Sequence, residues 1–177
     1  MQAEGYKFIF EEARRQKPVC SMALNWCFNE PWPSAANNNL VSWPHQPKPA
    51  YYAVQAACRP VLASARVAKF SWQGGETFEA EIWILNEAPT AVAAGRVAVS
   101  LEVAGSRVTL ASFDFPELAP KQNFRGPTAR GALATADAAT FTLTVHVIDR
   151  PELDSSYTFS YRAQRERSPA TQRALNS

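Results

Sequence analysis

The sequence is poor in most features that mark specialised classes of protein. Its 177 residues include three cysteines and two histidines, and the formal net charge is only +2. Cys20, Cys27 and Cys58 are too few and too unevenly spaced for a disulfide framework, and they form no Cys-x-x-Cys pair of the kind that binds zinc. We therefore expect no metal and no other cofactor, and we interpret these thiols as buried, small hydrophobic groups.

The low net charge and the lack of long apolar runs argue against nucleic acid and membranes as partners. A nearly neutral chain lacks the basic surface that binds nucleic acid or an acidic membrane. No stretch approaches the roughly 20 apolar residues that span a bilayer, and the N-terminus lacks the pattern of a signal peptide. The compartment stays open. An apolar share of 46% and a charged share of 19% are typical of a globular chain with a hydrophobic core.

The first part of the chain, up to about residue 59, has a helical and loop-like pattern. In residues 2–16, Tyr6, Ile9, Phe10 and Ala13 share one helical face, with the charged residues of positions 11–15 largely opposite. The almost uninterrupted apolar run at 19–28 predicts a strand that is buried on both faces, as in a parallel sheet. A long loop at 29–47, with turn-like asparagines at 37–39, leads to a short helix that begins at Pro49.

Beyond residue 60 the hydrophobic period falls to two, which indicates strands. Phe78, Ala80, Ile82 and Ile84 share one face of such a strand, and turn signals lie at 73–76, 104–106 and 150–151. The expected strands span residues 62–72, 77–86, 95–103, 107–115, 132–134, 140–149 and 156–164. This mainly β pattern predicts an immunoglobulin-like β-sandwich, followed by a polar, flexible tail.

Three segments, in order along the chain, resemble the end of the catalytic barrel in glycoside hydrolase family 2, especially the branch of β-mannosidases and exo-β-glucosaminidases. QAEGYKFIFEEARRQKP resembles the seventh barrel helix, CSMALNWCFNEPWP the eighth strand and its mouth, and PKPAYYAVQAACRP the eighth helix. In that family an immunoglobulin-like domain follows the barrel. The resemblance implies a partial (β/α)8-barrel segment (helix, strand, loop, helix) at 1–59, the sandwich at 60–164 and the tail at 165–177.

The resemblance also implies a chemistry. Members of this kind release terminal β-linked sugars with retention, using two glutamates roughly 5 Å apart as acid/base and nucleophile. In the family these glutamates follow the fourth strand and end the seventh, which places both before Met1. We therefore expect no catalytic residue in this chain, and no glycosidase activity from it alone.

The motif Asn29-Glu30-Pro31 is of the type that carries the catalytic acid in many sugar-cleaving barrels. Because the resemblance assigns it to the eighth strand, we interpret Asn29 and Glu30 as polar groups at the rim of the sugar pocket; a catalytic-acid role for Glu30 is the alternative. The resemblance implies that Trp26 forms the floor on which the terminal sugar stacks, with core packing as its alternative. Trp32 lines the pocket or packs between domains, and a cis Trp26–Cys27 bond is expected in the complete enzyme.

A second hypothesis makes the chain a free-standing β-sandwich module that binds a glycan or a protein partner. Trp72 and Trp83 would then be candidates for a carbohydrate-binding surface. Under either hypothesis the run at 19–28 lacks the neighbouring barrel strands that would cover it. We expect this run to fold back on the sandwich, to stay poorly ordered, or to pair with a second copy of the chain, so self-association is one expected interaction.

Overall fold

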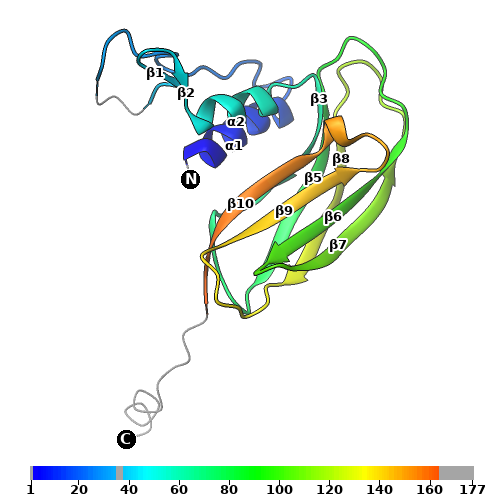
Figure 1. The fold of residues 1–177 in the computed structure, drawn as a ribbon. Coiled ribbons are helices and arrows are strands. Elements are labelled where there is room, and N and C mark those ends of the chain that lie inside the picture. Colours follow the sequence, from blue (N-terminus) through cyan, green and yellow to red (C-terminus); the bar gives the residue numbers. More distant parts are fainter. Residues whose placement is uncertain (1, 35–37, 164–177) are drawn as a thin grey trace, which may run out of the picture.

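The computed structural model describes residues 2–34 and 38–163, and the tail expected at 165–177 lies outside them. A sandwich of two β-sheets carries two helices against one of its sides (Figure 1). The elements are α1 (Gln2–Arg15), β1 (Val41–Ser42), β2 (Gln46–Pro47), α2 (Pro49–Ala57), β3 (Val61–Arg66), β4 (Ser71–Gln73), β5 (Thr77–Asn86), β6 (Gly95–Val103), β7 (Ser106–Phe115), β8 (Phe124–Ala132), β9 (Thr140–Val147), a 3-10 turn (Pro151–Leu153) and β10 (Ser155–Arg162).

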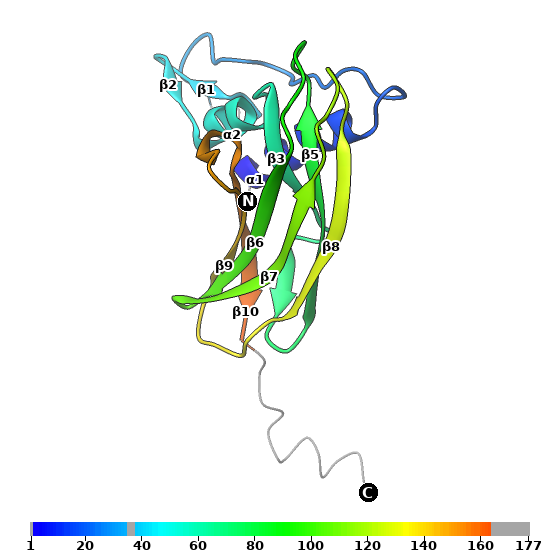
Figure 2. The ribbon, with the colours of Figure 1, turned by 90° about the vertical axis from the view of Figure 1, so that its right-hand side faces the viewer.

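The two sheets face each other in the order β3-β5-β8 and β4-β10-β9-β6-β7 (Figure 2). Neighbouring strands are antiparallel, except that β4 runs parallel to β10. The chain leaves the first sheet after β3 and enters the second as β4, so its first strand is divided between the sheets. This order is immunoglobulin-like, and the prediction of a β-sandwich is confirmed.

The core lies between the sheets, and its composition follows the alternation seen in the sequence. Phe78, Ala80, Ile82 and Ile84 of β5 are all buried, and so are the alternate apolar residues of β9. Trp72 is also buried, with its ring 5.0 Å from that of Phe78. The suggestion that Trp72 belongs to a carbohydrate-binding surface is therefore wrong, because β4 turns this side chain into the core.

Strand β8 is much longer than the three residues expected at 132–134. Its segment contains Gly126, Pro127 and Gly131, which argue against a strand in the interior of a sheet. In the structure β8 is an edge strand, and its register with β5 shifts opposite Gly126 and Pro127. A Cβ on Gly126 would lie 2.7 Å from the ring of Phe113. Because Gly126 and Gly131 have no Cβ, side chains of β7 can pack directly against the β8 backbone.

The run at 19–28 is not a strand, so this part of the sequence-based prediction is wrong. It is an irregular segment in which Leu24 is 84% exposed and Trp26 is 81% exposed. Only an isolated bridge between Asn29 and Val41 follows it. A strand needs a neighbouring strand to pair with, and among the described residues no strand pairs with 19–28. The segment does not fold back on the sandwich, and the helix-strand-loop-helix order of a partial barrel is not reproduced.

The orientation of α1 also differs from the expected one. Ile9, placed on the apolar face, is 61% exposed, whereas Lys7, Glu11 and Arg15 are buried against the sandwich. The helix docks through a stripe of charged residues because the neighbouring strand edges offer backbone groups that charged side chains can bind. Among the described residues, no helix is long and apolar enough to cross a membrane.

Candidate functional site

Glu30 is the centre of a loop that the structure describes at residues 29–34 and 38–48, called here the Glu30 loop. Its side chain is only 7% exposed. The Asn39 amide donates to Oε1 over 3.0 Å, and the backbone N–H of Trp43 donates to Oε2 over 3.0 Å. Lys48 Nζ lies 3.6 Å from Oε1 and also donates to the Asn39 side-chain oxygen. One carboxylate therefore connects both ends of the loop.

Backbone bonds and a small apolar cluster complete the loop. The N–H groups of Leu40 and Val41 donate to the Phe28 carbonyl, each over 3.0 Å, and β1 pairs with β2. Leu40 and Val41 pack with Ala50 of α2 in a cluster that is separate from the sandwich core. The loop is thus held by its own interactions and by α2.

The hydrogen bonds of Glu30 decide how its carboxylate can act. The N–H of Trp43, and after it the amide of Asn39, lower the pKa of Glu30 below its ordinary value of 4.5. A general acid in a glycosidase needs a raised pKa, so that it still holds its proton at the working pH. The geometry therefore opposes a catalytic-acid role and supports an anchoring one.

The other residues of the predicted sugar site are exposed to solvent. Trp26 and Trp32 carry large exposed rings, which excludes core packing for Trp26 in this chain, and Asn29 is also exposed. Among the described residues, neither tryptophan forms a hydrogen bond with Glu30. The structure therefore brings Glu30 together with Asn39, Trp43 and Lys48. Sugar contacts by Trp26, Asn29, Glu30 and Trp32 stay predictions.

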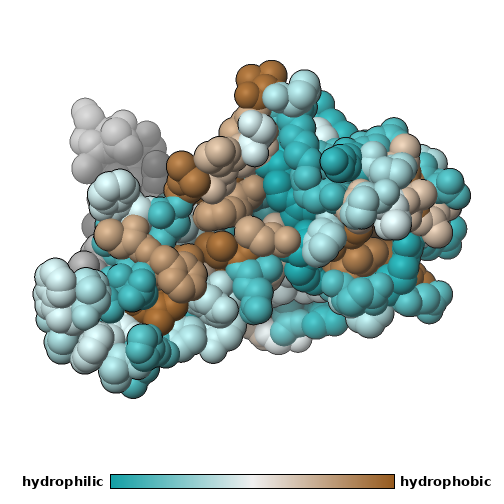
Figure 3. Space-filling model, turned by 90° about the horizontal axis from the view of Figure 1, so that it is seen from above, coloured by the Kyte–Doolittle hydropathy of each residue, from teal (hydrophilic) through white to brown (hydrophobic). Residues whose placement is uncertain are grey.

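The apolar surface that remains exposed is concentrated in the helical part of the molecule. Seen from above, hydrophobic residues lie on this surface away from the mostly hydrophilic sandwich (Figure 3). The exposed large side chains here are Ile9, Val19, Met22, Leu24, Trp26, Phe28, Trp32, Trp43 and Tyr52. Single exposed apolar residues need no explanation, but a set of this size in one part of a chain is a candidate contact surface.

The cis peptide bonds of the described residues precede Pro18 and Pro44, and Trp26–Cys27 is not among them. The expectation of a cis bond there concerns the complete enzyme and stays a prediction.

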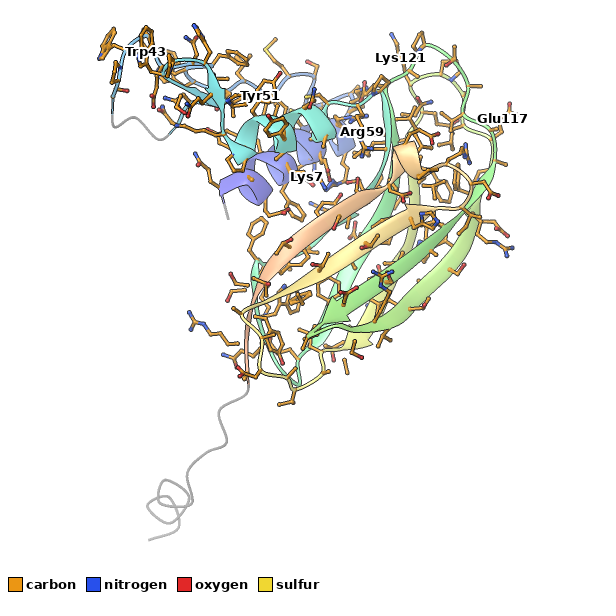
Figure 4. All side chains as sticks on the ribbon, in the orientation of Figure 1. Lys7, Trp43, Tyr51, Arg59, Glu117 and Lys121 are labelled. Atoms are coloured by element: carbon orange, nitrogen blue, oxygen red, sulfur yellow. The ribbon has the colours of Figure 1, made fainter. Side chains whose placement is uncertain are left out.

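A groove of about 570 Å³, lined in part by Lys7, Tyr52 and Arg59, opens between the helices and β10 (Figure 4). The predicted sugar-site residues do not line it. No group of His, Cys, Asp and Glu within residues 2–34 and 38–163 could hold a metal ion.

A second polar centre, which the sequence interpretation missed, lies between α1 and the sandwich. Glu11 is fully buried, and its Oε2 accepts hydrogen bonds from Ser64 Oγ over 2.5 Å and from the Tyr157 hydroxyl over 2.8 Å. Arg15 donates to Ser64 Oγ and to the Ala65 carbonyl, each over 3.1 Å. Burial raises the pKa of Glu11 and also that of Tyr157.

The only trace of this centre in the sequence is a spacing of four. Lys7, Glu11 and Arg15 follow one another at i, i+4 and i+8, which places them on one stripe of a helix. Such a stripe usually faces solvent, and its burial here could not be foreseen without knowing which strand edges it meets.

The chain has relatives among β-mannosidases. It is 33% identical over 94 residues to β-mannosidase B of Aspergillus niger, which covers 49% of this chain and 11% of that protein. The β-mannosidase B of Emericella nidulans is 31% identical over 94 residues, with the same coverage. The matching region thus spans about a tenth of the length of these relatives. No family model matches the chain.

Solved structures resemble the sandwich only distantly. The CARDB domain of a Pyrococcus furiosus protein is 12% identical, with a TM-score of 0.45 over 59% of this chain and 94% of that chain. A β-glucosidase from Listeria innocua, solved in complex with glucose, is 11% identical, with a TM-score of 0.40 over 57% of this chain and 16% of that chain. Likenesses of this size decide nothing about function.

Proposed function

We propose that this chain is the C-terminal part of a retaining exo-β-glycosidase of the β-mannosidase type, in glycoside hydrolase family 2. Residues 1–59 would contribute the end of the catalytic barrel, and the sandwich would follow it. The similarity to β-mannosidase B supports an origin of this kind. The substrate would be a terminal β-linked sugar, and no cofactor is required by two-carboxylate chemistry.

The exposure of the segment 19–28 is the observation that carries this proposal. An apolar run of strand length ends directly before the Glu30 loop, and its large apolar side chains are exposed in the described chain: Val19, Met22, Leu24, Trp26 and Phe28. Each large apolar side chain left in water forgoes roughly 1.5 to 3 kcal/mol of burial free energy, so a run of them is expected to have a partner. Barrel strands on both sides would supply that cover and would give the backbone its hydrogen bonds.

In the complete enzyme the segment would bring Trp26 to the floor of the sugar pocket. The apolar face of a pyranose suits an indole ring, and Asn29, Glu30 and Trp32 would lie around its rim. The two catalytic glutamates would come from upstream strands. Glu30, ionised and bonded to Trp43, would shape the rim and transfer no proton.

The chain alone is expected to be inactive, which can be measured directly. Purified protein should release no nitrophenol from nitrophenyl β-mannoside or nitrophenyl β-glucosaminide. Turnover that survives purification and disappears in Glu30→Gln would contradict the proposal, because it would make Glu30 the catalytic acid of a self-sufficient site.

The DNA immediately upstream of Met1 provides the decisive comparison. The proposal expects an in-frame barrel with two glutamates at strand ends, and the protein expressed from that longer frame should hydrolyse the mannoside. Trp26→Ala should lower its kcat/KM by at least about tenfold through lost stacking, while Trp83→Ala in the sandwich should leave it unchanged. A promoter and ribosome-binding site directly before Met1 would instead favour the free-standing binding module.

A further inference from the structure

The open side of the sandwich, between β3 and β10, is where α1 docks. Strand β4 pairs only with residues 160–162 of β10, so the first half of β10 has no strand of the described chain beside it on that edge. Within residues 2–34 and 38–163, β3 pairs only with β5, so its other edge is open as well. Free edges expose unpaired backbone N–H and C=O groups, which folded proteins normally cover.

Side chains of α1 bind these free backbone groups. Lys7 Nζ donates to the Ser156 carbonyl over 2.7 Å, and Glu4 accepts a hydrogen bond from the Thr158 N–H over 3.2 Å. Both partners belong to the uncovered half of β10. On β3, Arg15 donates to the Ala65 carbonyl. The helix therefore binds strand-edge groups on both sheets, in the way that an additional strand would.

The two edges are also joined through the centre of this interface. The Ala65 N–H of β3 donates to the hydroxyl of Tyr157 on β10 over 3.0 Å, and that hydroxyl donates to Glu11. Phe8 enters the sandwich core beside them, with its ring 4.9 Å from that of Phe70 and 5.1 Å from that of Tyr157. The position of α1 is thus fixed by both sheets.

The same helix contacts the Glu30 loop on its other side. The Tyr6 hydroxyl donates to the Asn38 carbonyl over 2.8 Å, and the next residue, Asn39, binds the Glu30 carboxylate. Tyr6 also packs on the apolar cluster of Leu40, Val41 and Ala50. A continuous set of contacts therefore runs from β3 and β10 through α1 to Glu30.

We propose that α1 is a positioning element: it closes the open side of the sandwich and thereby holds the Glu30 loop in place, with Glu11 and Tyr6 as positioning residues. This coupling exists in the chain whether or not the proposed glycosidase function is correct. If that function is correct, the sandwich acts as the support of the pocket rim, although it touches no sugar.

Amide hydrogen exchange on the intact chain tests the coupling. Three amides report on it, because each donates to a side chain: Ala65 to Tyr157, Thr158 to Glu4, and Trp43 to Glu30. In Glu11→Ala all three should exchange at least about tenfold faster than in the wild type, while amides of the β6–β9 pair keep their rates. Glu11→Gln keeps an acceptor for Ser64 and Tyr157 and should restore the wild-type rates.

Two further variants separate positioning from general loss of stability. Tyr6→Phe should accelerate exchange at Trp43 and leave Ala65 and Thr158 unchanged, since it breaks only the link to Asn38. Ile9→Ala, on the exposed face of the same helix, should change none of the three. The proposal is overturned if Trp43 keeps its rate in Glu11→Ala, or if β6 and β9 lose protection to the same extent.

Discussion

Two buried glutamates show how local partners set the behaviour of one residue type. Glu30 accepts a backbone N–H and an amide, which favour its charged form and lower its pKa. Glu11 lies in an environment dominated by burial, which favours its neutral form and raises its pKa. The stability that Glu11 contributes is therefore complete below its ordinary pKa of 4.5 and is lost as the pH rises through the raised value.

Glu30 has the opposite dependence on pH. Because its pKa is lowered, its contribution to the order of the loop is present above 4.5 and is lost as the pH falls through the lowered value. The amide signal of Trp43 should therefore titrate with a midpoint below pH 4.5.

Glu30→Gln should abolish this titration of the Trp43 amide. Glu117→Gln, on an exposed loop far from Trp43 (Figure 4), is the matched control and should preserve it. A wild-type Trp43 amide signal that stays unchanged as the pH is lowered from neutral until the chain unfolds would show that the carboxylate does not hold the loop.

At the scale of single residues, the sequence predicts the role of a side chain better than its hydrogen-bond partners. Glu30 could be interpreted as a polar rim residue from its motif and its resemblance. Its bonds to Trp43 and Asn39 join residues 9 and 13 positions away, and no local pattern encodes them. The sequence predicts that Asn39 is one of three turn residues; in the structure it is a buried donor, and Asn37 lies outside the described residues.

Among the elements, strands with local signals were predictable and elements defined by their neighbours were not. Both β5 and β6 have the expected bounds, because their alternation and flanking turns are properties of the segment itself. The run at 19–28 has the composition of a strand, but a strand is made by its partners. The docked face of α1 depends likewise on the open edges of β3 and β10.

The docking of α1 predicts a contrast between adjacent residues. Phe8 is buried among Phe70, Tyr157 and Phe159, so Phe8→Ala should lower the free energy of unfolding by about 3 kcal/mol. Ile9 is exposed, so Ile9→Ala should change it by less than about 0.5 kcal/mol.

Urea unfolding, followed by circular dichroism, measures both values. Equal effects of the two substitutions would mean that α1 does not share the core of the sandwich.

At the scale of the whole molecule, the buried hydrophobic core and the exposed apolar side chains lie in different parts of the chain. The sandwich buries its apolar side chains between two sheets, whereas the helical part exposes a set of large ones that includes Leu24 and Trp26. This distribution makes the exposed set the candidate surface for contact with another protein chain.

This surface predicts self-association of the isolated chain. In sedimentation velocity, the weight-average sedimentation coefficient should rise with protein concentration. Leu24→Asp should keep the chain monomeric, because it places a charge in the apolar contact. Val108→Asp is the matched control, because Val108 is also exposed but lies on β7 of the sandwich. A wild-type chain that stays monomeric at all concentrations would contradict the prediction.

The bond between Tyr157 and Glu11 also sets an order of events during folding. Its two residues are separated by 146 positions, so it closes one of the longest loops that the chain can form. Helix α1 precedes its partner strand, β10, along the chain and is therefore synthesised before it. Until β10 is complete, Lys7 and Glu11 lack their partners Ser156 and Tyr157, so we expect the open side of the sandwich to close late in folding.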